Sequence, residues 1–267
     1  MNILIALILG LVQGLTEFLP VSSSGHLLLI KYFFQISEMG DFSFEIFVHL
    51  GTLCAVVIFF QHDIIGLLKS LFYFRQPEGL QQRKTCLWLF LATLVTGCFG
   101  FIGKEYVIKI THPMFIACMI GITGLILYIS DKIKNFHLPA NEIGIKKAII
   151  IGLGQALAIT PGISRSGTTI FCGLLVGLDR KAAATFTFLL AIPVILGANI
   201  TQITVLSNLE INQLFNYIVG FFAAFLSGYL VIAWLMKLII KAQLIYFAYY
   251  CWGVSLLSLF LIWRNFT

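Results

Sequence analysis

The 267-residue chain is 60% hydrophobic and only 10% charged, with a mean hydropathy of +1.00. A soluble domain has about half apolar and a quarter charged residues, so this composition excludes a soluble protein and predicts several membrane-spanning helices. The net charge of +6 does not indicate nucleic-acid binding, because the basic residues are scattered thinly between apolar segments. The six cysteines lie in apolar runs without metal-type spacing, and we interpret them as small hydrophobic residues.

Ten apolar segments follow one another along the chain. Six of them are long enough to cross a hydrocarbon core of about 30 Å, which needs roughly 20 residues with some tolerance. The other four form two pairs, each made of one segment followed by a short one. In chain order the ten segments are Asn2–Leu19, Ser24–Phe34, Phe44–Phe60, Thr85–Ile102, Met114–Ser130, Lys146–Thr160, Thr168–Leu178, Ala184–Ile203, Leu214–Met236 and Gln243–Trp263.

The short segments Ser24–Phe34 and Thr168–Leu178 have eleven residues each. At about 1.5 Å per residue they reach about 16 Å, or half of a bilayer. Each follows another apolar segment across a polar break, "LPVSSSG" or "TPGISRSG". We therefore predict two re-entrant helix–break–helix hairpins, each followed by three full transmembrane helices. The N-terminal run lacks a basic start and a cleavage site, so we expect it to belong to the mature fold.

An internal repeat relates the two hairpins. At an offset of 142 positions, "ILGLVQGLTEFLPVSSSG" (Ile8–Gly25) and "IIGLGQALAITPGISRSG" (Ile150–Gly167) share eight identical residues of eighteen, including glycines, serines and a glutamine. Because each unit has an odd number of spans, the second copy must be inverted relative to the first, with both broken helices near the midplane. The sequence thus predicts an all-α polytopic membrane protein with an inverted-topology repeat. We expect a single membrane domain over 1–267, with repeat one at about 1–130 and repeat two at about 146–267.

Lysine and arginine are distributed unevenly between the two predicted sides of the membrane. Twelve of the 17 lie on one side and four on the other, while Arg165 lies in the second break. The side rich in these residues is expected to be cytoplasmic. Both termini and the mouth of the first hairpin then face outward, and the second hairpin enters from the cytoplasm.

Polar side chains gather at the two breaks. Irregular backbone at membrane depth is tolerated only where protein or a water-filled cavity surrounds it, so we expect the two breaks to meet. Gln13 and Glu17 are four residues apart and share a helix face. Ser23 and His26 are three apart, close enough for a contact between hydroxyl and imidazole. The polar set is Gln13, Glu17, Ser22, Ser23, Ser24 and His26 from the first break, and Ser164, Arg165, Ser166, Thr168 and Thr169 from the second.

Each short helix begins directly after its serines. A helix N-terminus offers free N–H groups and a partial positive charge, which favour a phosphate. Arg165 adds a guanidinium between two hydroxyls, and this group fits phosphate oxygens in a bidentate fork. The pattern therefore predicts a diphosphate clamp inside the membrane.

Structural alternatives stay open for several of these residues. Serines after a proline are also ordinary helix caps, and Arg165 could pair with Glu17 only to hold the repeats together. Gln155 is interpreted as a partner of Gln13 across the pseudo-twofold axis. For His49 we favour helix packing or interfacial hydrogen bonding over chemistry. For Glu45, also at the start of that span, the two interpretations are balanced.

The motifs "EFLPVSSSGH" and "PGISRSGTT", about 140 residues apart, resemble the signatures of the undecaprenyl-diphosphate phosphatase family, also called bacitracin-resistance proteins. The resemblance covers essentially the whole chain, including "FEIFVHLGTLCAVV" and "FTFLLAIPVILGA". It implies removal of one phosphate from the C55 isoprenoid diphosphate, which regenerates the lipid carrier for peptidoglycan and other envelope polymers. It also implies a divalent cation, Mg²⁺ or Ca²⁺, and a site open to the outer face of the bacterial inner membrane.

The resemblance implies a role for each matching position. The carboxylate of the family's glutamate motif falls on Glu17, and its essential serine and histidine fall on Ser23 and His26. Many members have a second glutamate where this chain has Gln13, so Glu17 and Gln13 are the expected metal ligands. The expected catalytic residues are Ser23, His26, Glu17 and Arg165, and the expected substrate-binding residues are Ser22, Ser24, Ser164, Ser166, Thr168 and Thr169.

The residues leave the chemistry open between three routes. Ser23 could attack the terminal phosphorus with His26 as base, His26 could attack, or a metal-activated water could attack. The rival function is a lipid-phosphate flippase, because inverted repeats with broken helices are transporter architecture. A flippase would not need a hydroxyl beside an imidazole and a carboxylate, so the sequence favours the enzyme. The expected partners are the polyprenyl diphosphate and membrane lipids, without nucleic acid, and a homodimer is left open.

Overall fold

The computed structural model describes residues 2–36, 42–72, 77–109, 112–133, 138–201 and 213–266. Within these ranges the chain forms eleven α-helices and one short 3-10 turn, and no strand beyond an isolated bridge between Leu138 and Leu178. The helices are α1 (Ile3–Phe18), α2 (Ser23–Phe33), α3 (Phe42–Phe59), α4 (Gln61–Ser70), α5 (Pro77–Lys109), α6 (Pro113–Lys132), α7 (Gly144–Leu157), α8 (Arg165–Leu175), α9 (Arg180–Thr201), α10 (Leu214–Ile240) and α11 (Ile245–Phe266).

Five of the described helices are long and apolar enough to cross a membrane, namely α5, α6, α9, α10 and α11. A sixth candidate span is the pair α3 and α4, which is bent by 76° at the single residue between them. The prediction of an all-α polytopic membrane protein is therefore confirmed.

Two elements differ from the prediction. Helix α4 was not expected, because His62, Asp63 and Lys69 interrupt its apolar pattern. Helix α5 extends beyond the predicted Thr85–Ile102 at both ends. Its added N-terminal turns carry glutamine, arginine and lysine, which favour helix formation and need no hydrocarbon around them.

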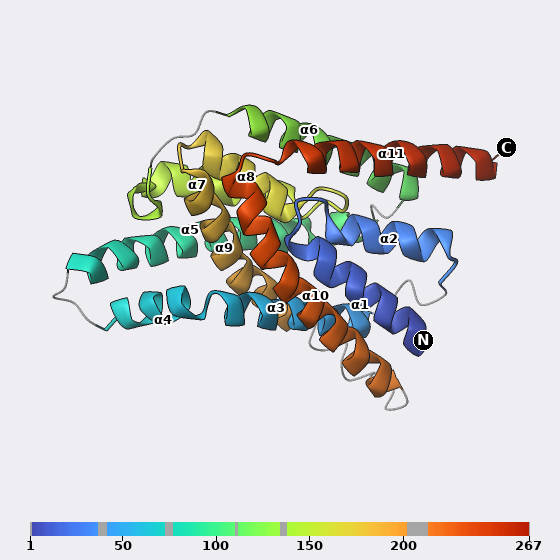
Figure 1. The fold of residues 1–267 in the computed structure, drawn as a ribbon, viewed down its shortest axis with the longest axis horizontal. Coiled ribbons are helices and arrows are strands. Elements are labelled where there is room, and N and C mark those ends of the chain that lie inside the picture. Colours follow the sequence, from blue (N-terminus) through green and yellow to red (C-terminus); the bar gives the residue numbers. More distant parts are fainter. Residues whose placement is uncertain are drawn as a thin grey trace.

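The two hairpins extend toward opposite ends of the molecule. Figure 1 shows both chain termini and the far end of α2 at one end, whereas α7 and α8 lie toward the other end. The open end of the second hairpin is closed by a hydrogen bond from the Leu138 N–H to the Gly177 carbonyl at 3.2 Å. This arrangement agrees with two half-length hairpins that enter from opposite faces. The membrane orientation itself stays a prediction, and Arg75 and Lys134, both counted for it, lie outside the described residues.

The first helix of each half packs against a helix of the other half, as a two-fold relation between the halves requires. Helix α1 of the first half packs against α10 of the second, and α7 of the second half packs against α5 of the first. The equivalent glycines Gly10 and Gly152 mark these contacts. A Cβ at Gly10 would lie 2.5 Å from the Gly220 carbonyl oxygen, and one at Gly152 would lie 2.8 Å from that of Ala92. Only glycine allows such close backbone approach between membrane helices.

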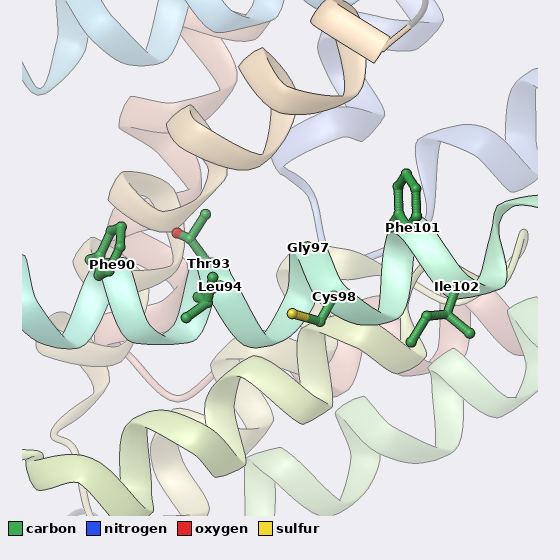
Figure 2. Close-up of a pocket in the computed structure, with 7 residues that line it drawn as sticks. All are labelled: Phe90, Thr93, Leu94, Gly97, Cys98, Phe101 and Ile102. Carbon is green, nitrogen blue, oxygen red and sulfur yellow. The ribbon is translucent and has the colours of Figure 1, made fainter.

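Apolar side chains fill the space between the helices, and many other large apolar side chains are exposed on the surface, as expected for a protein surrounded by lipid. All six cysteines are free thiols, and Cys172 and Cys251 are buried, which fits their interpretation as small hydrophobic residues. A shallow apolar cavity lies along the middle of α5 between Phe90 and Ile102 (Figure 2). None of the polar residues of the two breaks lines this cavity, so it is separate from the polar centre.

Candidate active site

The two breaks are in direct contact, as the sequence predicts. The Ser166 hydroxyl of the second break donates to the carbonyl of Leu19 in the first break at 3.1 Å. A Cβ built on Gly25 would stand 3.1 Å from the Cα atom of Gly162. The breaks therefore shield each other's irregular backbone from lipid, which is the condition for such backbone at membrane depth.

Equivalent serines cap the two short helices. The Ser22 hydroxyl accepts the Gly25 N–H at 3.3 Å, and the Ser164 hydroxyl accepts the Gly167 N–H at 3.1 Å. Ser22 has a φ of +72°, a left-handed conformation that is uncommon for a side chain of this kind and is often found at functional sites. Both caps leave the next residue, Ser23 or Arg165, as the first residue of its helix.

The carboxylate of Glu17 is the centre at which the two halves meet. Its side chain is only 5% exposed. The Ser23 hydroxyl donates to Oε2 at 2.6 Å, and the Gln13 amide donates to the same oxygen at 2.9 Å. Arg165 donates through Nη2 to Oε1 and forms an ion pair. His49 Nε2 lies 3.9 Å from Oε2. The pairing of Arg165 with Glu17, which the sequence left open as a structural alternative, is thus present, and it links α1 to α8.

The Arg165 side chain is 16% exposed, and among the described residues its guanidinium donates a hydrogen bond only to Glu17. Its remaining N–H groups are therefore free to donate to a ligand. A guanidinium offers five N–H donors in a planar fork, so one can hold a carboxylate while others reach phosphate oxygens.

His26 is held by two partners, neither of which is Ser23. Nδ1 lies 2.8 Å from the Ser22 carbonyl oxygen, and Nε2 lies 3.0 Å from the hydroxyl of Tyr250 in α11. A carbonyl can only accept, so Nδ1 carries the proton, and in the neutral ring Nε2 accepts from Tyr250. The two rings are parallel within 5°, with centroids 5.6 Å apart.

The expected contact between Ser23 and His26 is therefore wrong, because Glu17 takes the Ser23 hydroxyl and the Ser22 carbonyl takes the imidazole. Tyr250 was missed by the sequence analysis. It lies 224 residues from His26 in a helix rich in aromatic residues, and no local pattern sets it apart from its neighbours.

The other expected phosphate-binding residues have several different environments. Ser24 is exposed, with its Oγ 3.5 Å from that of Ser22, and Ser164 and Ser166 lie with their hydroxyls 3.2 Å apart. The Thr169 hydroxyl donates to the Arg165 carbonyl at 2.8 Å. The buried Thr168 hydroxyl has no hydrogen-bond partner among the described residues.

The predicted pairing of Gln155 with Gln13 is wrong. The amide of Gln155 donates to the Thr96 hydroxyl of α5 at 3.1 Å, and that hydroxyl in turn donates to the carbonyls of Ala92 and Gly152. Gln13 instead donates to Glu17 within its own helix. The physical reason is proximity. Gln13 has a partner, Glu17, one turn along its own helix, and Gln155 has a partner, Thr96, on the neighbouring helix α5.

The donors beside Glu17 fit a divalent cation. Among the described residues no group of three or more His, Cys, Asp and Glu side chains gathers at one point. However, the buried Oε1 of Gln13 has no hydrogen-bond partner there, and its amide nitrogen bonds the Glu17 carboxylate. Carboxylate and amide oxygens suit Mg²⁺ and Ca²⁺, and Mg²⁺ commonly uses one or two protein oxygens and completes its shell with water and substrate phosphates.

The fold and the polar centre define a polytopic membrane protein with two oppositely inserted re-entrant hairpins and a buried site suited to an anionic headgroup. Residues 6–257 match the family described as bacitracin resistance protein BacA, and the chain belongs to that family.

The chain is also similar to relatives named undecaprenyl-diphosphatase over nearly its full length. It is 40% identical over 265 residues to undecaprenyl-diphosphatase 1 of Shouchella clausii, covering 96% of this chain and 95% of the relative. It is 40% identical to the undecaprenyl-diphosphatase of Methanobrevibacter smithii, covering 96% of both chains. It is 42% identical to that of Treponema denticola, covering 94% of both. These likenesses confirm the family expected from the two motifs.

Proposed function

We propose that the protein is an integral membrane phosphatase that hydrolyses undecaprenyl diphosphate to undecaprenyl phosphate and inorganic phosphate. One observation carries the proposal: the Ser23 hydroxyl donates at 2.6 Å to a buried carboxylate that also holds Arg165. A hydroxyl bonded to a base and beside a fixed cation is the arrangement of an activated nucleophile for an anionic substrate. A flippase needs the positive charge of Arg165 to bind the phosphates, but it does not need the activated Ser23 hydroxyl. The names of the relatives support the same choice.

The substrate binds with its prenyl tail in lipid and its diphosphate at the junction of the two breaks. Arg165 meets the phosphate oxygens with its remaining N–H groups. The first residues of α2 and α8 add free backbone N–H groups and the positive ends of two helix dipoles. The Thr168 hydroxyl, which has no partner among the described residues, is a further donor at the start of α8.

In the proposed reaction, the Ser23 oxygen attacks the terminal phosphorus while Glu17 accepts the hydroxyl proton. The bond from that phosphorus to the bridging oxygen breaks, and undecaprenyl phosphate leaves with the bonding electrons. Glu17 passes this proton to the departing phosphate and is again a carboxylate. Water then attacks the phosphoserine while Glu17 accepts one of its protons. The bond from phosphorus to the Ser23 oxygen breaks, Glu17 returns the proton to Ser23, and inorganic phosphate leaves. We prefer Glu17 to His26 as the base because Glu17 holds the Ser23 proton, whereas both ring nitrogens of His26 bond elsewhere.

Glu17 and Gln13 would hold a divalent cation, Mg²⁺ or Ca²⁺, and that ion would supply positive charge where a carboxylate and phosphates must come together. Glu17 orients the Ser23 hydroxyl with or without the ion. Gln13 positions Glu17 through its amide N–H and leaves its carbonyl oxygen for the ion.

We place the protein in the bacterial inner membrane with its site open to the outer face, following the lysine and arginine distribution. Its action there would return the lipid carrier to envelope synthesis and so confer bacitracin resistance. The sequence leaves pairing with a second copy open, and mass measurement of the detergent-solubilised protein at several concentrations tests it.

The function is tested by phosphate release in detergent. The purified protein is given undecaprenyl diphosphate with Mg²⁺ or Ca²⁺, and free phosphate is measured. Turnover without any vesicle excludes a pure flippase. Ser23→Ala should reduce turnover by at least about 10³-fold, as expected for loss of a nucleophile.

Ser130→Ala is the matched control, because the Ser130 hydroxyl donates only to a carbonyl of its own helix at 2.7 Å. It should keep wild-type turnover. Phosphate release by Ser23→Ala at the wild-type rate would contradict the serine route, and the absence of phosphate release by the wild-type protein would contradict the function.

A further inference from the structure

His49 faces the polar centre from α3, although the sequence favours a packing role for it. Its Nε2 atom lies 3.9 Å from Oε2 of Glu17, and its side chain is 29% exposed. Helix α3 therefore contributes to the site as well as the two hairpins.

The hydrogen bond at Nδ1 of His49 determines whether its Nε2 atom faces Glu17 with a lone pair or with a proton. Nδ1 lies 2.7 Å from the main-chain oxygen of Glu45, one helical turn earlier. That oxygen can only accept, so Nδ1 carries a proton, and the neutral ring has its lone pair on Nε2, on the side of Glu17. A backbone carbonyl on the far nitrogen is the usual device that fixes the tautomer of a metal-binding histidine.

Three electron-pair donors are thus available around the Glu17 carboxylate. They are Oε2 of Glu17, Nε2 of His49 and Oε1 of Gln13, which is buried without a hydrogen-bond partner among the described residues. Two atoms that bind one ion at about 2.1 Å each can stand no more than about 4.2 Å apart. The 3.9 Å between the Glu17 and His49 atoms lies within that limit.

The alternative is a protonated His49 in a simple ion pair with Glu17. Arg165 already balances the charge of Glu17. The Glu45 carboxylate, the acidic group of α3, bonds the buried Lys31 ammonium at 2.7 Å and does not balance the charge of an imidazolium at His49. An imidazolium would also leave the Gln13 oxygen unsatisfied, at a cost of about 1–3 kcal/mol for a buried acceptor. A bound cation satisfies all three donors.

We propose that His49 is the third protein ligand of the divalent cation, beside Glu17 and Gln13, and that it shifts the preference of the site from Ca²⁺ toward Mn²⁺. This inference rests on the cation of the proposed function. Ca²⁺ takes six to eight oxygen ligands, whereas an imidazole nitrogen suits transition metals. A set of two oxygens and one nitrogen therefore matches Mn²⁺ better than Ca²⁺.

The test uses Mn²⁺ as a paramagnetic probe on the full-length protein in detergent, alone and with inorganic phosphate. Electron spin echo envelope modulation detects a nitrogen bonded to Mn²⁺, and labelling the histidines with ¹⁵N changes that signal in the wild-type protein. We expect a histidine nitrogen signal in the wild type and its loss in His49→Gln. We also expect at least about a tenfold weaker Mn²⁺ affinity in this variant, with a smaller change for Ca²⁺.

His62→Gln is the control, because His62 is an exposed histidine on α4 and should change neither signal nor affinity. The proposal is overturned by a nitrogen signal that persists in His49→Gln, by a wild-type spectrum insensitive to ¹⁵N-histidine under both conditions, or by the absence of Mn²⁺ binding. Phosphate release is measured on the same samples. Continued turnover alongside any of these results would remove His49 as a ligand and leave the phosphatase function standing.

Discussion

The two breaks share one scaffold and differ in the chemistry they carry. In each, a serine caps a short helix, and the next residue, Ser23 or Arg165, bonds to the same Glu17 carboxylate. At the offset of 142 positions, however, the counterpart of Glu17 is Ile159 and that of His26 is Thr168. The first break therefore supplies the nucleophile and the base, and the second supplies the fixed positive charge. The two breaks thus share the capping hydrogen bond, although φ is +72° at Ser22 and −73° at Ser164, and they differ in their functional side chains.

After Ser23→Ala, the largest effect should come from the Arg165 guanidinium of the second break. Arg165→Lys replaces the planar fork by a point charge, and turnover should fall by about 10²–10³-fold, as for the loss of a donor that stabilises the transition state. Arg180→Lys is the control, because Arg180 bonds the main-chain oxygens of Asp131 and Ile133. Near wild-type phosphate release by Arg165→Lys would show that charge alone suffices at this position.

The two glutamines should respond differently to the same substitution. Gln13→Leu removes a donor to Glu17 and a candidate metal ligand, so turnover and cation affinity should fall by about 10- to 100-fold. Gln155→Leu removes only a bond to Thr96, and turnover per folded molecule should be unchanged. Steady-state phosphate release with a titration of the cation measures both variants. Equal losses of turnover in Gln13→Leu and Gln155→Leu would mean that the two glutamines have the same role, so that the breaks are functionally symmetric.

A smaller effect is expected at the contact between the first break and α11. Tyr250→Phe removes the hydroxyl that holds His26 Nε2, a bond of about 1 kcal/mol, so turnover should fall by roughly fivefold. Tyr249→Phe alters an exposed neighbour that contacts Trp252 and should be neutral. A Tyr250→Phe enzyme indistinguishable from wild type in kcat and KM would remove this residue from the site.

The smallest effect on catalysis should come from the equivalent glycines at the helix contacts. Gly10→Ala and Gly152→Ala each force a Cβ against a main-chain oxygen and should lower stability by about 1–3 kcal/mol, with normal turnover in the folded fraction. Gly97→Ala should cost nothing, because a Cβ there meets no atom within 4 Å. Thermal unfolding in detergent compares the three. Unequal losses of stability in Gly10→Ala and Gly152→Ala would show that the α1–α10 and α5–α7 contacts are less symmetric than the sequence repeat.

The hairpins, their contact and the central residues could be predicted because the polar breaks interrupt apolar runs and repeat at a fixed offset. Glu17, Ser23 and Arg165 stood out as polar groups where lipid was expected, and the structure brings them together. The roles proposed for them, and the limits of the two repeats, stay predictions.

Other contacts could not be found from spacing. Whether Ser23 turns to His26 or to Glu17 depends on which acceptor the folded break brings nearer, and both lie within reach along the chain. His49 and Tyr250 contact the centre from α3 and α11, and only the packing of whole helices determines which of their residues face it. Helix α4 escaped notice because its charged residues obscure the apolar pattern.

The ion pair across the two breaks has a consequence for biosynthesis. Glu17 precedes its partner Arg165 by 148 residues, so the ribosome delivers the acidic residue long before the basic one. A lone charge at the middle of the bilayer costs about 2.5–3.5 kcal/mol by insertion scales. The nascent first hairpin should therefore wait near the aqueous boundary and settle to full depth only after the second half has been inserted.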